Sequence, residues 1–208
     1  MKFSVVSVVW NEGKRLKKCL EQFKNYTDDI VIIDTESSDD TYSIAKSYTT
    51  KLLKVPFVGY ADCYYESALL RAKYNWCVFA YPDEEWNNEM LEYLKNNEFD
   101  GYSSIHYLRK EIVDGKEIDT GGWHWRVIKK GEVFLADMAD GAILDDRILQ
   151  LNQYIIHNKS SEEMRIDRDN RKIVFPILIN KYKYTKMYPF NIKVEDWRGQ
   201  LEELNERL

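Results

Sequence analysis

Short apolar runs alternate with amphipathic stretches through the first hundred residues, and this alternation limits the fold more than any other feature. The runs begin at residues 3, 29, 51 and 76 and read "FSVVSVV", "DIVIID", "KLLKV" and "WCVFA". Such compact, largely β-branched or apolar runs are typical of strands buried on both faces. Leu16, Cys19, Leu20 and Phe23 then follow the first run at helical spacing. Alternating strands and helices predict an α/β fold with a mostly parallel, covered sheet.

Boundary signals place three further helices and a different second half. We expect a helix beginning near Ser38 or Asp39, either of which can cap it, one through residues 61–73, and one capped by Asn87 or Asn88. After residue 100, "GYSSIHYLRKEI", the turn "DGK" and "WHWRVIKKGEVFLA" predict antiparallel strands. Residues 150–208 offer a strand at "KIVFPILI" and a terminal amphipathic helix at "VEDWRGQLEELNERL".

Composition limits the partners and the compartment. The 30 basic and 35 acidic residues give a net charge of −5, so the protein has no overall positive charge that would attract nucleic acid or anionic lipid. The three cysteines lack C-x-x-C spacing, which argues against a zinc site or a disulfide framework. The apolar run at the N-terminus ends in Asn-Glu-Gly rather than a small-residue cleavage site, and no segment approaches about 18 apolar residues, so we expect neither a cleavable leader nor a membrane span. We expect a cytoplasmic protein, with peripheral membrane attachment and a homodimer left open.

Two acidic clusters close strands of the predicted sheet. "DTESSDD" follows the second strand from Asp34, and "YPDEEW" follows the fourth at residues 81–86. Ligands of open α/β sheets lie outside the carboxyl ends of the strands, so both clusters would share one rim. One carboxylate could accept hydrogen bonds from a base or ribose, and another could hold a hard divalent cation. The pair suits a nucleoside diphosphate bound with its metal.

Three sequence blocks carry a family resemblance. "SVVSVVWNEGKRLKKCLEQF", "DDIVIIDTESSDDTYSIAKSY" and "ESALLRAKYNWCVFAYPDEEW" resemble successive blocks of family-2 glycosyltransferases with the GT-A fold. Together with "WRVIKKG" they are most similar to the branch that extends lipopolysaccharide cores and related glycans. The resemblance implies a catalytic domain at 1–150, with a nucleotide-binding half at about 1–100 and an acceptor half at about 100–150. Residues 151–208 would form an appendage packed on it.

The resemblance also implies donor-binding residues. Asn11 and Glu12 would end the first strand beside the nucleotide, and Asp34 would contact the uracil or another base. Glu36 stands in this donor loop where the family usually has glycine. A solvated loop cap would explain the acidic character of Asp34 but not its place at the end of a strand.

The metal site departs from the family pattern. Asp83 matches the last Asp of the Asp-x-Asp motif, the implied ligand of Mn²⁺ or Mg²⁺, whereas the first Asp is replaced by Tyr81. Tyr81 could hydrogen bond to ribose, and Glu84 could supply a second acid or simply favour a helix N-terminus. His124 is an alternative third ligand or an ordinary strand histidine. An Arg-Asn pair of the family is replaced at residues 65 and 66, which removes a cation near the diphosphate.

An inverting transfer also needs a carboxylate base and a cation for the leaving group. Asp140 falls where the resembling branch has a His-Glu pair, and Asp137 is the competing candidate for the base. A turn Asp before glycine would equally explain Asp140. Arg126, or one of Lys129 and Lys130, could face the donor diphosphate.

These patterns predict a glycosyltransferase that uses a nucleotide-sugar donor, with a UDP-sugar favoured, and a glycan, lipid-linked or other hydroxyl acceptor. Two alternatives belong to other classes. One is a catalytically silent GT-A-like protein that binds a glycan or protein partner. The other is a nucleotidyltransferase, which would need a Gly-rich phosphate loop that "WNEGKR" lacks. The stretch "KYKYTKMYPFNIK" at 181–193 could contact a glycan, a membrane or nucleic acid, or form an edge strand guarded by lysines.

Overall fold

The computed structural model describes residues 1–57, 64–118, 122–132 and 147–169. The chain divides into two compact units, Met1–Ser161 and Glu162–Leu208. The described part of the second unit is helical, and its Arg165 forms ion pairs with Glu162 and Asp169. The predicted strand "KIVFPILI", the terminal helix and residues 181–193 lie outside the described residues.

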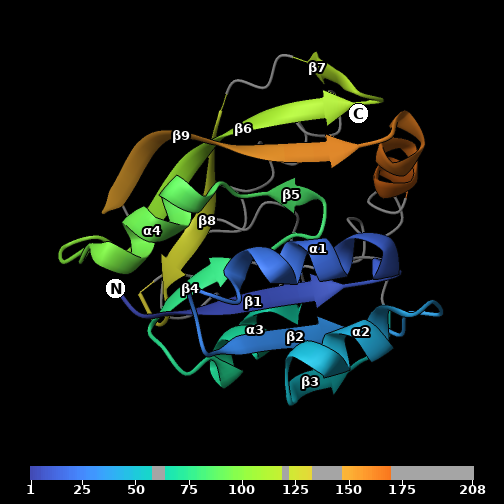
Figure 1. The fold of residues 1–208 in the computed structure, drawn as a ribbon, viewed down its shortest axis with the longest axis horizontal. Helices are drawn as coiled ribbons and strands as arrows, with labels where there is room; N and C mark the ends of the chain where they lie inside the picture. The colour runs from blue at the N-terminus through green and yellow to red at the C-terminus, as the bar shows by residue number, and fades with distance from the viewer. Residues whose placement is uncertain (58–63, 119–121, 133–146, 170–208) are drawn as a thin grey trace, which may run out of the picture. The chain divides into compact units, whose positions relative to one another are not determined.

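The parallel half of the sheet contains the four predicted strands. They are β1 (Phe3–Val9), β2 (Ile30–Asp34), β3 (Lys51–Lys54) and β4 (Trp76–Phe79). Their order is β3-β2-β1-β4 and every neighbouring pair is parallel (Figure 1). The strands therefore end at one shared edge, as the sequence predicts for the two acidic clusters.

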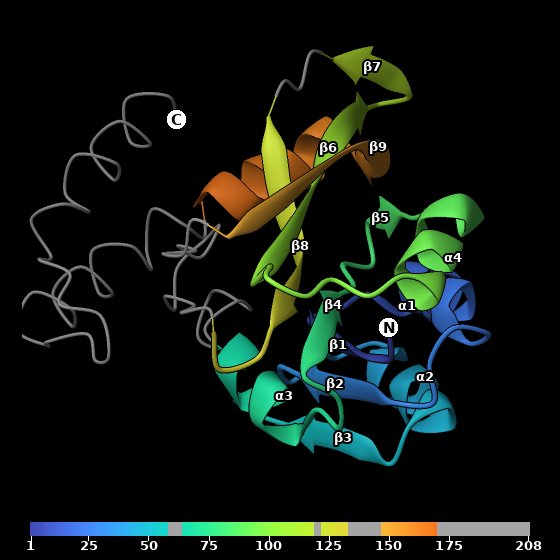
Figure 2. The same ribbon diagram turned by 90° about the vertical axis from the view of Figure 1, so that its left-hand side faces the viewer.

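The second half extends the same sheet from β4. Its strands are β5 (Glu84–Glu85), β6 (Ser104–Val113), β7 (Lys116–Ile118), β8 (Trp123–Lys129) and β9 (Ile148–Lys159). The order continues β4-β8-β6-β9-β5, with β7 on β6, and Figure 2 shows β6, β7 and β9 at the opposite end from β2 and β3. The β4–β8, β8–β6, β6–β7 and β5–β9 pairs are antiparallel, whereas β6 and β9 are parallel. The predicted mixed α/β fold is confirmed.

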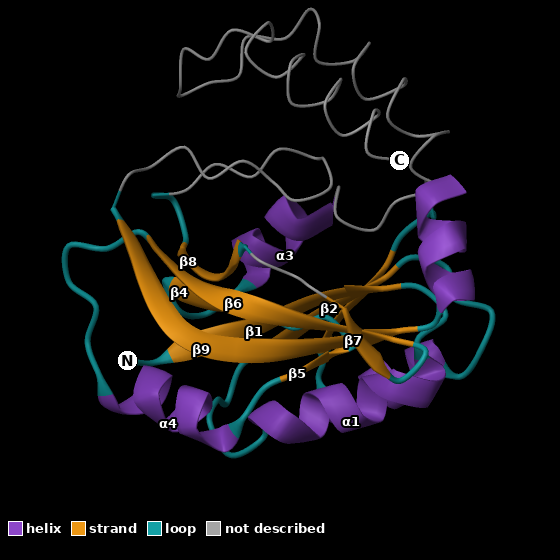
Figure 3. Cartoon of the chain, turned by 90° about the horizontal axis from the view of Figure 1, so that it is seen from above, coloured by secondary structure: helices purple, strands orange, loops and turns teal. Residues whose placement is uncertain are grey.

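The helices that the structure describes in the first unit are α1 (Gly13–Phe23), α2 (Thr41–Tyr48), α3 (Tyr65–Arg71) and α4 (Asn88–Asn96). Figure 3 shows α1 and α4 on one face and α3 on the other. Side chains of β1 alternate between these layers: Phe3 and Val5 pack in the core with α1 and α4, and Val6 and Val8 pack with α3. Burial of both faces explains why β1, β2 and β4 read as continuous apolar runs.

One of two expectations about helix starts needs correction. The helix predicted from Ser38 or Asp39 begins at Thr41, and its N-cap residue Asp40 makes no side-chain cap. The Asp39 carboxylate instead accepts from the Thr41 amide and from the α1 amide of Gly13. For α4 the prediction is confirmed, because the Asn87 side chain caps the helix by accepting from the Met90 amide at 2.7 Å.

β9 was not predicted, and the expected domain boundary at residue 150 falls inside this strand. Its exposed positions are Gln150, Asn152, Tyr154, Ile156 and Asn158, most of them polar or aromatic, so its apolar content is lower than that of β1. Pairing with β6 over its length fixes β9 in the sheet. This long-range pairing leaves little trace in the local sequence.

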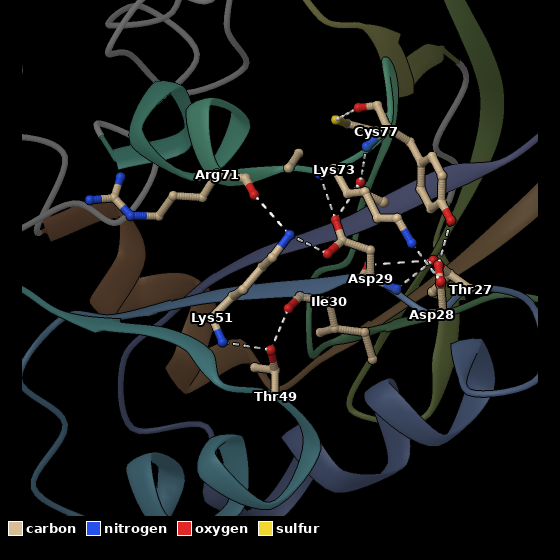
Figure 4. A network of polar contacts seen from close by, with 12 residues as sticks. Thr27, Asp28, Asp29, Ile30, Thr49, Lys51, Arg71, Lys73 and Cys77 are labelled. Carbon is tan, nitrogen blue, oxygen red and sulfur yellow. Dashed lines mark hydrogen bonds and ion pairs between the residues drawn. The ribbon is translucent and has the colours of Figure 1, made fainter.

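The opposite edge of the parallel strands is held by a network of polar contacts (Figure 4). Asp29, which is buried, accepts hydrogen bonds from Ser4 Oγ at 2.6 Å, the Lys73 amide at 2.7 Å and Lys51 Nζ at 2.5 Å. Asp28 pairs with Lys73 at the exposed side. Both carboxylate oxygens of Asp29 therefore have hydrogen-bond partners, in contrast to those of Asp34 at the other end of β2.

Candidate active site

The polar loop after β2 holds the start of α1. Three successive amides at the helix N-terminus donate to side chains of this loop: Asn11 N to Ser37 Oγ (2.9 Å), Glu12 N to Thr41 Oγ1 (2.7 Å) and Gly13 N to Asp39 Oδ2 (3.0 Å). These amides would otherwise lack partners at a helix N-terminus. Much of the acidic and hydroxylic cluster therefore serves to tie the β1 and β2 loops together.

Asn11 and Glu36 both adopt the left-handed backbone region, each with φ of 54°. Asn11 tolerates this conformation, and its Oδ1 accepts from the Ser38 amide at 2.8 Å. Glu36 is exposed and has no such preference, which gives a physical reason why glycine suits this position. Its Oε2 accepts from the Phe57 amide at 3.4 Å, so Glu36 links the β2 loop to the segment after β3.

Asp34 ends β2 as a buried acid with one oxygen unsatisfied. Its Oδ2 accepts from the Ser37 amide at 3.3 Å, while Oδ1 is buried and has no hydrogen-bond partner among the described residues. Beside it, Trp10 follows the register partner of Asp34 in β1 and stacks on Phe57 with ring centroids 4.1 Å apart. A buried acceptor without a partner is costly, so this oxygen is suited to a hydrogen-bond donor from a ligand.

Asp83 lies after β4 and is held by two side chains of β9. Its Oδ2 accepts from His157 Nε2 at 3.0 Å and from Lys159 Nζ at 3.2 Å. The other ring nitrogen of His157 contacts the Glu111 carboxylate. Because both ring nitrogens face carboxylates, both are expected to donate, which requires the charged imidazolium.

The pKa values in this cluster follow from burial and pairing. Burial alone would lower the pKa of His157, but its hydrogen bonds to Asp83 and Glu111 outweigh burial and raise it. Burial alone would raise the pKa of Asp83, but the His157 hydrogen bond and the Lys159 charge hold it well below its usual range. The cluster is therefore a set of charged groups at neutral pH.

Register explains how β9 delivers these side chains. Residues 157 and 159 point to the same side of the strand, and His157 pairs with Glu111 of β6. An irregularity in β9 opposite Tyr107 and Leu108 sets this register. Sequence reasoning assigned no role to His157 and did not consider Lys159, and the only local signal would have been the weak alternation of "LNQYIIHNK".

Glu84 and Arg126, predicted for the metal and the donor, bind each other. The side chains are 1% and 6% exposed, both carboxylate oxygens accept from Arg126 Nε at 2.8 and 2.9 Å, and Nη2 adds a contact at 2.5 Å. The guanidinium also lies over the Tyr81 ring, 4.5 Å from its centroid. This places Tyr81 against a buried ion pair, and the Tyr65 ring lies tilted against the Tyr81 ring with centroids 5.7 Å apart.

Glu12 links the two parts of the rim. Burial raises the pKa of its carboxyl to about 7, and the nearby Asp83 charge adds to the shift, although Arg15 and Lys159 oppose it. Arg15 Nε donates to Glu12 at 3.0 Å. Glu12 can therefore hold or release a proton near neutral pH at the end of β1.

The described side chains do not fit a divalent cation at this rim. Hard cations take several oxygen ligands, yet both Glu84 oxygens bind Arg126, Asp83 already binds two cationic groups, and Tyr81 has no carboxylate. No group of three or more His, Cys, Asp or Glu side chains among the described residues could hold a metal. The Lys159 ammonium would also repel a metal ion. For each positive charge of an ion about 4 Å away, the repulsion is about 4 kcal/mol at an effective dielectric constant of about 20.

The remaining predicted residues are placed as follows. His124 lies on β8, opposite Tyr107 of β6. Asp137 and Asp140, the candidate bases, lie outside the described residues. In the part of the chain that the structure describes, no helix has the length and apolar content needed to cross a membrane.

Sequence comparison places the chain among known proteins. The family described as glycosyl transferase family 2 matches residues 4–137. A glycosyltransferase of Rickettsia typhi is 30% identical over 116 residues, which cover 53% of this chain and 37% of the relative. Glycosyltransferase SunS of Bacillus phage SPbeta is 46% identical over 39 residues, or 19% of this chain and 9% of the relative. The match thus spans well under half the length of these relatives.

Solved structures agree on the fold. TarS 1–349 of S. aureus, solved in complex with UDP, has a TM-score of 0.56 at 19% identity, covering 97% of this chain and 78% of that chain. Glucosyl-3-phosphoglycerate synthase of Mycobacterium tuberculosis, solved with Mn²⁺ and UDP-glucose, has a TM-score of 0.54 at 15% identity, covering 85% and 78%. These similarities show the GT-A-like fold, with its curled, mostly parallel sheet and antiparallel second half.

Proposed function

Because the chain belongs to glycosyl transferase family 2, we propose that it moves a sugar from a nucleotide-sugar donor, with a UDP-sugar favoured, to an acceptor hydroxyl. The observation that carries the proposal is the family match over residues 4–137, which includes the parallel half of the sheet except Phe3, the first residue of β1. TarS with UDP and the synthase with UDP-glucose support uracil as the base.

Asp34 is the proposed contact for the base. Its Oδ1 is buried and finds no hydrogen-bond partner in the described ranges, so a ligand N–H could satisfy it. The stacked rings of Trp10 and Phe57 next to this loop offer an apolar surface of the kind on which a base can pack. Asn11 and Glu36 would act through the loop, since their own polar atoms bind neighbouring backbone amides.

The proposed transfer inverts the anomeric carbon. The acceptor oxygen forms the new bond, its proton passes to a carboxylate base, and the bond to the diphosphate breaks with its electron pair on the departing oxygen. Asp140 stays the predicted base, with Asp137 the competing candidate. The negative charge that develops on the diphosphate requires a nearby cation.

A divalent metal is one source of that cation. The Mn²⁺ of the synthase supports the metal assistance predicted from the sequence. In this chain Asp83 would have to release Lys159 or His157, and Glu84 would have to leave Arg126, before either could bind a metal. We therefore assign no step of the transfer to a metal.

A catalytically silent relative is the second candidate. Tyr81 at the position of an acid, and the two ion pairs that occupy Asp83, favour a protein that keeps the fold and binds a glycan or protein partner. The lipopolysaccharide-core branch, the cytoplasmic location, the domain division at residue 150 and a homodimer stay predictions.

Calorimetric titration tests the donor site. UDP, GDP and CDP are titrated, with and without Mn²⁺, into the wild type, Asp34→Ala and the control Asp28→Ala, whose carboxylate is exposed at the opposite edge of the strands. We expect UDP to bind the wild type and Asp28→Ala alike and to bind Asp34→Ala at least about tenfold more weakly. A folded protein that binds none of the three nucleotides would contradict sugar transfer and favour the silent relative.

A further inference from the structure

We propose that Glu36 is a positioning residue for the nucleobase, because its carboxylate holds the Phe57 backbone and thereby keeps the Phe57 ring stacked on Trp10. The inference rests on the proposed function and deepens its base site. It assigns a role to an exposed side chain whose backbone conformation favours glycine. Glu36 makes no contact with the base itself and acts through Phe57.

The backbone of Glu36 is strained, and local contacts do not explain the strain. Its φ of 54° lies in the left-handed region, which glycine adopts freely and a residue with a Cβ adopts at a cost. Asn11 shares this conformation, but its Oδ1 accepts from the Ser38 amide at 2.8 Å and from the Ser38 hydroxyl at 3.2 Å. The Glu36 side chain is exposed and adds little to the core. Glycine would form the same turn with less strain, so the carboxylate is the feature that needs a reason.

The carboxylate of Glu36 takes over a hydrogen-bond ladder where the backbone ladder stops. β3 pairs in parallel with β2, and the Val55 amide donates to the Asp34 carbonyl at 2.9 Å. Pro56 has no amide hydrogen, so the next donor of the segment is the Phe57 amide. In a regular parallel ladder this amide would bind the Glu36 carbonyl, two residues beyond Asp34. The left-handed turn ends the ladder there, and Glu36 Oε2 accepts from the Phe57 amide at 3.4 Å instead.

This link fixes an aromatic ring near the buried acid of the proposed base site. Phe57 stacks on Trp10 with ring centroids 4.1 Å apart and an angle of 5° between the planes. Trp10 follows Val9, the register partner of Asp34, so Trp10 extends from the strand end next to that of Asp34. Without the carboxylate, Phe57 loses its tie to the β2 loop, and a binding base would have to order the segment. Order that is already present in the free protein raises affinity, because binding no longer bears its entropic cost.

The proposal predicts opposite effects on stability and on affinity at one residue. Glu36→Gly relieves the left-handed backbone and removes the carboxylate, so it should be at least as stable as the wild type and yet bind the base more weakly. Glu36→Gln keeps a side-chain oxygen that accepts hydrogen bonds, so it should keep the affinity. A residue with a merely structural role would lower stability and affinity together.

Two measurements and a matched control separate these roles. Calorimetric titration of UDP measures affinity, with Mn²⁺ or with EDTA, whichever gives the tighter binding to the wild type, and differential scanning calorimetry measures the melting temperature. Asp114→Gly is the control, because Asp114 is also a left-handed acidic residue, with φ of 50°. It lies in the turn between β6 and β7, which Figure 2 shows at the other end of the sheet from β2. Phe57→Ala and Phe57→Ala/Glu36→Gly complete a double-mutant cycle that reports whether Glu36 acts through Phe57.

We expect Glu36→Gly to weaken UDP binding about three- to tenfold, the usual effect of losing one hydrogen bond, with a melting temperature no lower than that of the wild type. Glu36→Gln and Asp114→Gly should bind UDP within about twofold of the wild type. Phe57→Ala should weaken UDP binding at least about threefold. Adding Glu36→Gly to Phe57→Ala should then change the affinity by less than about twofold.

Three results would overturn the role of Glu36 and leave the proposed transferase intact. One is a Glu36→Gly variant that binds UDP as tightly as the wild type or more tightly. Another is a Phe57→Ala variant that binds like the wild type, or a full Glu36→Gly loss in its background, since either would mean that Glu36 does not act through Phe57. The third is a melting temperature that falls together with the affinity, which would mean that Glu36 serves the fold of the loop. No binding of UDP, GDP or CDP by the folded wild type would contradict the proposed function itself, and with it this inference.

Discussion

Replacement of Arg126 by methionine tests whether this residue serves the fold or the donor. The change leaves the Glu84 carboxylate, whose side chain is 1% exposed, without its three contacts from the guanidinium. Removing one partner of a buried ion pair costs about 3–5 kcal/mol, because the other charge stays buried and unpaired. For a chain of this size the melting temperature should fall by about 6–20 °C.

Urea unfolding followed by tryptophan fluorescence measures this loss. The double variant Glu84→Met/Arg126→Met removes both charges and should regain most of the lost free energy of unfolding, because no uncompensated charge remains. Arg165→Met is the matched control for losing an arginine, since Arg165 is half-exposed and pairs with Glu162 and Asp169 on its own helix. Its unfolding midpoint should stay at the wild-type value.

A loss below about 1 kcal/mol in Arg126→Met would refute the reasoning. It would mean that the buried Glu84 carboxylate costs little free energy without Arg126. Arg126 could then bind the donor, as the sequence predicted. A UDP affinity that falls in Arg126→Met while the free energy of unfolding stays constant would establish the same point from the binding side.

Two further predictions concern other acids. Asp29→Ala should lower the free energy of unfolding by about 2–4 kcal/mol, because Ser4, Lys51 and the Lys73 amide lose a buried acceptor. It should leave the UDP affinity unchanged, because Asp29 lies at the opposite edge of the strands from the candidate site. A variant as stable as the wild type would contradict the role of this network. Burial raises the folded pKa of Glu12 to about 7, so wild type loses stability as pH rises from about 4.5 through about 7. The free energy of unfolding of Glu12→Gln, measured with urea, should therefore rise relative to that of wild type by up to about 3 kcal/mol between about pH 5 and about pH 8. A difference between the two proteins that does not change with pH would contradict the raised pKa of Glu12.

Local pattern was sufficient for the parallel half of the molecule. Apolar runs of strand length and helical spacing such as that of Leu16 and Leu20 are properties of neighbouring residues, so β1 to β4 and α1 could be predicted. The place of Asp34 followed from the same pattern, because the carboxyl ends of parallel strands share one edge. The start of α2 could not be predicted in this way, because the Asp39 side chain accepts a hydrogen bond from the Gly13 amide at the start of α1.

The partners of the candidate site were decided by tertiary structure alone. His157 and Lys159 reach Asp83 only because β9 pairs with β6 and β5 in one register, and a shift by one residue would turn both side chains to the other face. Glu84 meets Arg126 from a segment 42 residues away. Contacts between distant segments depend on register and packing across the sheet, which no short stretch of sequence contains, whereas the sequence of each strand and helix determined its own form.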